Sequence, residues 1–257
     1  MTAAYEYLRD RDAAHIWHGR APDEPAPGDA LLLGEDELRS VRRMSSRAAV
    51  RYTASHAALR RVLARYLDVA PQEVAFGRRP CPRCGHPRHG RPRVDGPVTD
   101  LDFNFSRSGG HWLLAVVVGR QVGVDVEDGR RLDVEGASKL VMSASELAHA
   151  RSRPDEAARL DAFFRAWTRK EAVVKASGVG IITDLKAVDV QPHRDGPVVV
   201  RHTEPTGPGT WLVQDLPTAD GAFAALAREA GSTGPVELCD YEEPRNEERQ
   251  WRGVLVP

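Results

Sequence analysis

The stretch HWLLAVVVGRQVGVDVE, residues 111–127, contains two β-strand patterns joined by a short turn. His111–Val118 and Gln121–Glu127 are the two strand-like runs, and Gly119–Arg120 is the turn between them. Helix and strand patterns precede this stretch, and the same order follows it. The chain is therefore predicted to be an α+β protein with two halves that meet near residue 120.

A long helix is predicted on each side of that meeting point. From Ser46 to Asp68 apolar residues recur at helical spacing, with arginines on the opposite face. The second helical pattern is strongest from Asp155 to Ser177, after a capping box at Ser143–Glu146. Gly178 stands where a helix often ends in a left-handed residue.

Short strands are expected after the second helix, and residues 77–100 are expected to be loop. We divide the chain into an N-terminal half (1–120), a C-terminal half (121–230) and a polar tail (231–257). The short strands are expected at Ala187–Gln191, Val198–His202, Trp211–Asp215 and Ala222–Ala227.

The composition is that of an ordinary globular protein. The 257 residues are 41% hydrophobic and 28% charged, with a formal net charge of −1. The first residues are too charged for a signal peptide, and no apolar run approaches the roughly 20 residues of a membrane helix. With only three cysteines, a disulfide scaffold is not expected. These features predict a cytoplasmic protein with no membrane partner.

A basic block interrupts this neutral composition. Fourteen arginines lie between Arg39 and Arg93, opposed only by Asp68 and Glu73. Such a block favours an anionic partner: a phosphorylated small molecule, an acidic protein or nucleic acid. Its alternative is a solvated arginine-rich surface. Nucleic acid is not expected, because the whole chain is nearly neutral and carries no recognition motif.

Asp125 and Glu127 are candidate metal ligands. Alternate residues of a strand share a face, so these carboxylates project side by side while Val124 and Val126 point into the core. Gly123 lies on the carboxylate face, where it leaves room for a ligand. Adjacent carboxylates repel unless a cation lies between them, and oxygen ligands favour Mg²⁺ or Mn²⁺. The alternative is a pair of solvated acids at a sheet edge.

A second candidate set lies on the helix after residue 155. Trp167, Glu171 and Lys175 are four residues apart and share one stripe of the helix. Lys170 and Lys175 are two of only four lysines in the chain, which indicates a need for compact point charges. The alternative is an ordinary ion pair beside a core tryptophan, worth about 0.3–0.5 kcal/mol.

Together these motifs resemble the signature of 4'-phosphopantetheinyl transferases. Gly123–Glu127 matches the family pattern G-[VI]-D-x-E, and Trp167–Lys175 matches W-x-x-K-E-A-x-x-K. Phe103–Gly109, FNFSRSG, is similar to F-N-x-S-H-S-G, and Gly90-Arg91-Pro92 stands where the family has G-K-P. The resemblance runs from about residue 39 to 227. The length resembles the larger, monomeric type that activates peptide and polyketide synthases of secondary metabolite biosynthesis.

The resemblance implies a fold and an activity. It implies two similar α+β halves related by pseudo-twofold symmetry, with the active site in the cleft between them. The N-terminal half would bind coenzyme A and the carrier protein. The enzyme would transfer 4'-phosphopantetheine from coenzyme A to a serine of an acyl or peptidyl carrier protein and release 3',5'-ADP. The alternative is a non-catalytic or donor-altered paralogue that binds carrier proteins.

The resemblance also implies roles for individual residues. Asp125, Glu127 and Glu171 would hold Mg²⁺, with Lys170 and Lys175 near the coenzyme's diphosphate. Lys175 and Glu171 are expected to be catalytic, with Glu171 accepting the serine proton directly or through a metal-bound water, and Glu127 second for that role. The basic block would meet the 3'-phosphate and the carrier. The expected substrate-binding residues are Arg43, Arg47, Arg91, Ser106, Arg107, Lys170 and Lys175.

Two positions depart from the family pattern. Arg107 replaces a histidine that contacts the nucleotide end of coenzyme A in the family. His56 stands near where a basic arginine is expected. Because an arginine can bind phosphate with two parallel hydrogen bonds, we expect the first change to affect substrate detail rather than the reaction.

A cysteine–histidine loop raises a separate metal hypothesis. Cys81, Cys84, His86 and His89 have ligand types that zinc prefers. Four ligands within nine residues would strain the loop, although Cys239 could replace one histidine. We therefore favour a loop without metal over a structural zinc site, and both over redox chemistry.

Overall fold

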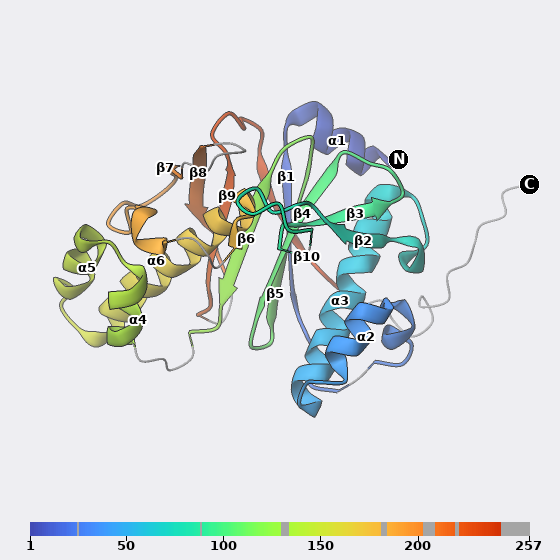
Figure 1. Cartoon of the computed structure of the whole chain (residues 1–257), viewed down its shortest axis with the longest axis horizontal. Coiled ribbons are helices and arrows are strands. Elements are labelled where there is room, and N and C mark those ends of the chain that lie inside the picture. Colours follow the sequence, from blue (N-terminus) through green and yellow to red (C-terminus); the bar gives the residue numbers. More distant parts are fainter. Residues whose placement is uncertain are drawn as a thin grey trace, which may run out of the picture.

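Two four-stranded sheets lie face to face, and a long helix covers the outer face of each (Figure 1). This arrangement comes from a computed structural model, which describes residues 1–24, 26–87, 89–129, 134–180, 184–202, 209–218 and 221–242. No helix in these ranges is long and apolar enough to cross a membrane. The α+β class predicted from the sequence is confirmed, whereas the pseudo-twofold relation stays a prediction.

The first sheet has the strand order β10-β1-β5-β4. The pairs β1–β5 and β5–β4 are antiparallel, whereas β10 and β1 are parallel. Helix α3 packs Val62 and Leu63 against Phe103 and Trp112 of this sheet. The elements of this half are α1 (Ala3–Arg11), β1 (Ala14–Arg20), η1 (Asp29–Leu32), α2 (Glu35–Val41), α3 (Ser46–Leu67), η2 (Pro71–Glu73), β2 (Ala75–Arg78), β3 (Pro92–Gly96), β4 (Leu101–Ser108) and β5 (His111–Val118).

The second sheet has the strand order β6-β9-β8-β7, with every pair antiparallel. Helix α6 covers it and packs Phe163 and Val173 against Trp211 and Val213. The elements of this half are β6 (Val122–Glu127), α4 (Val134–Val141), α5 (Ala144–Arg151), α6 (Glu156–Ser177), η4 (Leu185–Ala187), β7 (Val198–Arg201), β8 (Thr210–Asp215) and β9 (Phe223–Glu229).

Part of the predicted polar tail, residues 231–257, forms a strand. Residues Val236–Asp240 form β10, which adds in parallel to β1 at the edge of the first sheet. The C-terminal segment therefore returns to the N-terminal half, where it pairs with β1, a strand near the N-terminus. Residues 243–257 of the expected tail lie outside the described residues.

The prediction of a strand at Ala187–Gln191 is wrong. The short helix η4 ends at Ala187, and irregular backbone follows it. Its backbone groups bond to side chains of α5 and α6: Arg169 donates to the carbonyls of Val190 and Gln191, and Glu146 accepts the amide of Val190. A strand would need those same groups for its ladder.

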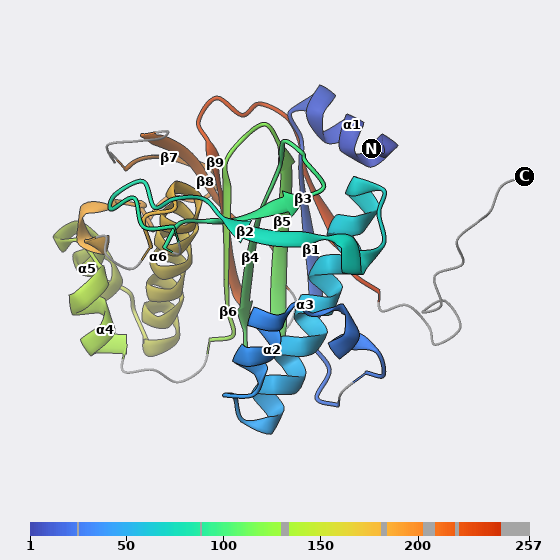
Figure 2. The same cartoon turned by 45° about the vertical axis from the view of Figure 1, so that its right-hand side comes forward.

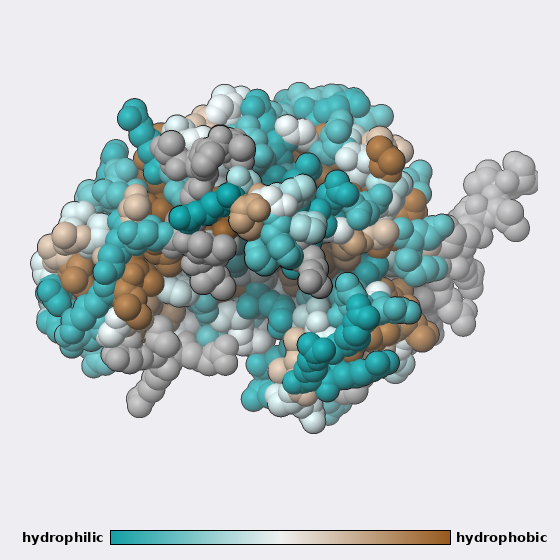
Figure 3. All heavy atoms as spheres, viewed as in Figure 1, coloured by the Kyte–Doolittle hydropathy of each residue, from teal (hydrophilic) through white to brown (hydrophobic). Residues whose placement is uncertain are grey.

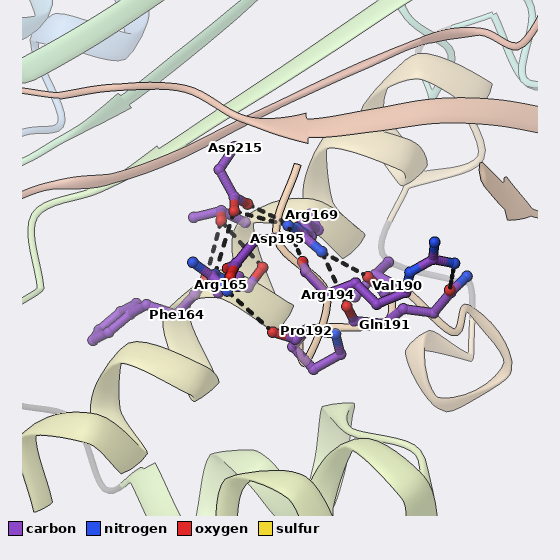
Figure 4. A network of polar contacts seen from close by, with 10 residues as sticks. Phe164, Arg165, Arg169, Val190, Gln191, Pro192, Arg194, Asp195 and Asp215 are labelled. Atoms are coloured by element: carbon purple, nitrogen blue, oxygen red, sulfur yellow. Dashed lines mark hydrogen bonds and ion pairs between the residues drawn. The ribbon is translucent and has the colours of Figure 1, made fainter. Parts of the chain in front are cut away.

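Buried Arg169 is the centre of a network that joins α6 to β8 and to residues 190–195 (Figure 4). Its guanidinium donates to the two carboxylate oxygens of Asp215 at 2.7 and 2.8 Å. It also donates to three backbone carbonyls, including that of Arg194. A buried charge with all these partners fixes the position of α6 over its sheet.

Glu37 joins α2 to α3 through a second buried network. Its carboxylate accepts hydrogen bonds from His56 Nδ1 at 2.7 Å, Arg60 Nη2 at 2.6 Å and the Gly34 amide at 2.8 Å. Burial opposes ionisation of Glu37, but these hydrogen bonds outweigh it and lower its pKa to about 2. A folded pKa below the unfolded one stabilises the protein above about pH 4.5.

The stabilising effect of Glu37 is expected to disappear in acid. Glu37→Gln should lower the free energy of unfolding by about 3 kcal/mol at pH 7, and by less than half of that at pH 3. Urea unfolding at the two pH values measures both differences. Glu35→Gln, an exposed neighbour on the same helix, should have no effect at either pH. An equal loss at pH 7 and pH 3 would show that the carboxylate charge of Glu37 is not what matters.

Candidate active site

Strand β6 and helix α6 bring the two predicted motifs together. Asp125 and Glu127 project from one face of β6, and Glu171 and Lys175 lie one turn apart on α6. The close approach of strand and helix depends on Gly123, because a Cβ there would lie 2.0 Å from the Ala172 carbonyl oxygen. Gly123 therefore makes room for the α6 backbone, and the expectation that it makes room for a ligand is corrected.

These side chains line a cavity of about 340 Å³ where the two halves meet. Ser106 and Arg107 reach it from β4 of the first half, and the other lining residues belong to the second half. The lining residues are Ser106, Arg107, Asp125, Val126, Glu127, Trp167, Glu171, Val174, Lys175 and Leu185. The molecular surface is also hollowed between the side that carries α4 and the side that carries α2 (Figure 3).

Asp125 is the most buried member of the cluster, with 3% of its surface exposed. Its Oδ1 forms an ion pair with Lys175 Nζ and accepts a hydrogen bond from Ser106 Oγ at 2.9 Å. Lys175 Nζ also donates to Ser106 Oγ at 2.8 Å. Burial raises the pKa of Asp125, although Lys175 and Ser106 oppose that rise.

The other two carboxylates differ in their partners. Glu127 accepts hydrogen bonds from Ser108 Oγ at 2.6 Å and from Trp167 Nε1 at 3.2 Å. No residue in the described part of the chain hydrogen-bonds to the Glu171 carboxylate. Burial raises the pKa of both groups, and repulsion from Asp125 adds to that rise. The cluster therefore favours binding a cation.

The chemistry of the cluster fits a hard divalent cation. Within the described ranges, no three histidine, cysteine or acidic side chains stand close enough to ligate one metal as they are arranged, and Lys175 pairs with Asp125 instead. However, Asp125 Oδ2 is buried without a hydrogen-bond partner in those ranges. An orphaned carboxylate oxygen beside two more carboxylates is a donor set that suits Mg²⁺.

Arg107 is held at the cavity by an aromatic stack. Its guanidinium carbon lies 4.6 Å from the ring centre of Tyr52, and the rings of Tyr52 and His56 stack with centres 3.8 Å apart. His56 does not line the cavity, and its Nδ1 hydrogen-bonds to Glu37 in the network described above. Arg43 and Arg47 are exposed and also outside the lining, and Arg47 pairs with Asp23.

The structure corrects the expected substrate contact of Lys170. Its side chain is 0% exposed and forms an ion pair with Glu146 at 2.7 Å. Its Nζ also donates to the carbonyls of Leu185 and Val188. Because Lys170 lies one residue off the stripe of Glu171 and Lys175, it points to α5 and not into the cavity.

Arg91, another expected substrate residue, is also buried in a structural contact. It is 6% exposed and forms an ion pair with Asp102 at 2.8 Å. Its side chain packs against Gly178, where a Cβ would come within 2.6 Å of Arg91 Cγ. Arg91 therefore fixes the loop between β2 and β3 against the end of α6, which Figure 2 shows side by side.

The cysteine–histidine loop shows one close pair. Cys84 Sγ lies 3.5 Å from His89 Nδ1, and the rings of His86 and His89 stack. Within the described residues these groups do not gather into a set of three ligands. The preference for a loop without metal over a structural zinc site stays a prediction, and neither takes part in the proposed function.

Sequence reasoning assigned no role at the site to Trp167 or Ser108. Trp167 stands in the second candidate set, with a core tryptophan as the alternative, and it lines the cavity and donates to Glu127. Its place on the stripe with Glu171 and Lys175 is the signal that indicates a role at the site. Ser108 was not singled out, although it alternates with Ser106 along β4 and contacts Glu127.

Three carboxylates and a lysine line one cavity, a set of side chains whose chemistry suits a divalent cation and phosphate groups. A family model described as the 4'-phosphopantetheinyl transferase superfamily matches residues 121–227. The chain is 32% identical over 226 residues to the 4'-phosphopantetheinyl transferase HetI of Nostoc sp. (strain PCC 7120), which covers 84% of this chain and 87% of HetI.

Two further relatives match over shorter regions. The chain is 25% identical over 142 residues to the 4'-phosphopantetheinyl transferase Sfp of Bacillus subtilis (strain 168), covering 55% of this chain and 58% of Sfp. It is 32% identical over 157 residues to psf-1 of Bacillus pumilus, covering 60% and 64%. The chain belongs to the 4'-phosphopantetheinyl transferase superfamily.

Proposed function

We propose that this protein transfers the 4'-phosphopantetheine group of coenzyme A to a serine of an acyl or peptidyl carrier protein and releases 3',5'-ADP. The observation that most strongly supports this proposal is the cluster of Asp125, Glu127, Glu171 and Lys175 around one cavity. It occurs in a chain that aligns with HetI over 84% of its length. One chain supplies both sides of the cavity, so we propose a monomer that acts in the cytoplasm.

The carboxylates are proposed to bind the metal, and Lys175 to bind phosphate. Asp125, Glu127 and Glu171 would hold Mg²⁺, or Mn²⁺, against the diphosphate of coenzyme A. When bound, the cation neutralises charge that develops on the phosphoryl oxygens and on the leaving group. Lys175 adds a positive charge at the same place, because its Nζ lies beside Asp125 and Ser106.

Glu171 is proposed to accept the serine proton. The serine oxygen attacks the phosphorus that carries pantetheine, and the bond from that phosphorus to the oxygen of 3',5'-ADP breaks. The electron pair of the broken bond leaves with 3',5'-ADP. Glu171 suits this role because its carboxylate has no hydrogen bond from the described residues and burial raises its pKa. Glu127, which already accepts two hydrogen bonds, is second.

Arg107 is proposed to bind the coenzyme from the first half of the chain, with Ser106 beside it. Both line the cavity. Arg43 and Arg47 are exposed beside α2 and on α3, and we propose that they meet the 3'-phosphate or an acidic face of the carrier protein. The non-catalytic alternative is less favoured, because all four residues of the cluster are retained.

Intact mass spectrometry tests the proposed reaction. An apo carrier protein is incubated with this protein, coenzyme A and Mg²⁺, with EDTA in a parallel reaction. The expected result is a gain of one phosphopantetheine mass that EDTA abolishes. No gain with several peptidyl and acyl carrier proteins, together with no binding of coenzyme A in calorimetry, would overturn the proposal.

Arg107 is expected to tolerate a change to histidine. Arg107→His should keep coenzyme A affinity, because an imidazole can also stack on Tyr52 and donate a hydrogen bond. Arg107→Ala loses the charge and the stack, and should raise the Kd at least about tenfold, which is about 1.4 kcal/mol. Isothermal titration of coenzyme A measures both. If the histidine variant binds as weakly as the alanine variant, the planar guanidinium itself is required.

A further inference from the structure

The two halves of the chain are joined at the site by a ladder of side chains. Strands β4 and β6 lie side by side (Figure 2), but no backbone ladder joins them in the described sheets. Instead, Asn104 Oδ1 accepts from the Val124 amide at 3.0 Å, Ser106 Oγ from Val126 at 3.3 Å, and Ser108 Oγ from Asp128 at 3.4 Å. The constant offset of 20 residues means that the two strands run in parallel.

The two serines of this ladder also contact the candidate metal ligands. Ser106 Oγ donates to Asp125 Oδ1 at 2.9 Å, and Ser108 Oγ donates to Glu127 Oε2 at 2.6 Å. Asn104 occupies the same ladder, and within the described residues it forms no hydrogen bond with either carboxylate. Each serine thus bridges one carboxylate and the backbone amide that follows it.

Hydrogen-bond capacity fixes the direction of the Ser106 hydroxyl. A serine hydroxyl offers one donor and two acceptor lone pairs. For Ser106, the Val126 amide and Lys175 Nζ occupy the acceptor side. The single O–H is then left for Asp125, so the hydroxyl holds the carboxylate and the lysine in one arrangement.

We propose that Ser106 and Ser108 are positioning residues that orient the Asp125 and Glu127 carboxylates for the divalent cation. The N-terminal half of the chain thereby sets the metal affinity of ligands that belong to the C-terminal half. This inference rests on the proposed function, which assigns the cation to these carboxylates. Partners of this kind change metal affinity by about 10–100-fold when they are removed from other metal sites.

The competing explanation is that the serines only join the two strands. Asn104 separates the two explanations, because it belongs to the ladder but not to the carboxylate contacts. Asn104→Ala leaves the buried Val124 amide unpaired, which should lower the melting temperature. It should leave the metal affinity close to that of the wild type.

Titration with Mn²⁺ alone, followed by electron paramagnetic resonance, tests the inference in the full-length protein. Ser108→Ala and Ser106→Ala should raise the Kd for Mn²⁺ about 10–100-fold. Ser108→Thr, which keeps the hydroxyl, should bind Mn²⁺ like the wild type. In the transfer reaction, Ser108→Ala should need a higher Mg²⁺ concentration for half-maximal rate and recover most of its kcat at saturating Mg²⁺.

The outcomes distinguish the inference from the proposed function. If the wild type binds Mn²⁺ and Ser108→Ala binds it equally well, the positioning role is overturned while the metal site stands. Equal losses of affinity in Asn104→Ala and Ser108→Ala would also overturn it, because the effect would then belong to strand joining. If the wild type binds no Mn²⁺, the metal site itself is overturned. Ser108→Thr gives the comparison with wild type even where an alanine variant fails to fold.

Discussion

Glu171→Gln is expected to abolish most transferase activity while leaving the fold intact. The change keeps the shape of the side chain but removes a charge that the proposal uses both to hold the cation and to accept the serine proton. Loss of one such electrostatic group typically lowers kcat by about 10²–10³-fold. The melting temperature should stay the same or rise, because burial, and then repulsion from Asp125 and Glu127, raise the pKa of Glu171 and the variant removes this unfavourable charge. Transfer measured by mass spectrometry, with melting in parallel, checks both parts.

A matched control lies on the same helix. Glu156 is exposed in the first turn of α6, so Glu156→Gln should transfer at the wild-type rate. If Glu171→Gln also kept the wild-type rate, the proton acceptor and one metal ligand would be misassigned, and Glu127 would be the next residue to change. A large fall in melting temperature would instead mean that Glu171 has a structural role.

Local periodicity predicts the four acidic and basic residues of the cluster, whereas Ser106 and Arg107 follow only from the family resemblance. Asp125 and Glu127 share a face because a strand repeats every two residues, and Glu171 and Lys175 share a stripe because a helix repeats about every four. Both periods depend only on neighbours in the chain. The long helices were predictable for the same reason, and the strand His111–Val118 was predictable from its continuous apolar run.

The errors depend on contacts between distant parts of the chain. Strand β10 pairs with β1, more than 200 residues earlier, and its own pattern is too polar to indicate a strand. Arg91 and Lys170 carry the charges of phosphate ligands, but Asp102 and Glu146 pair with them in the interior. Charge and spacing alone do not tell a buried ion pair from a ligand contact, because burial depends on the packing of other elements.

Lys170→Met is expected to have the largest effect on stability. The change leaves the Glu146 carboxylate buried at 2% exposure without its cation. It also removes the donor to the Leu185 and Val188 carbonyls. Breaking one side of a buried ion pair typically costs about 3–5 kcal/mol. For a protein of this size that loss lowers the melting temperature by about 10 °C, which urea unfolding and calorimetry would measure.

The matching variants separate burial from substrate binding. Glu146→Gln in the Lys170→Met background removes the uncompensated charge and should restore part of the lost stability, since glutamine can still accept from the Val190 amide. Lys186→Met, at an exposed lysine, should change stability by no more than about 0.5 kcal/mol. Below its melting temperature Lys170→Met should still bind coenzyme A. Glu146 and two backbone carbonyls hold the Lys170 side chain away from the cavity, so its loss should remove no contact to the coenzyme. Wild-type stability combined with lost coenzyme A binding would instead assign Lys170 to the diphosphate.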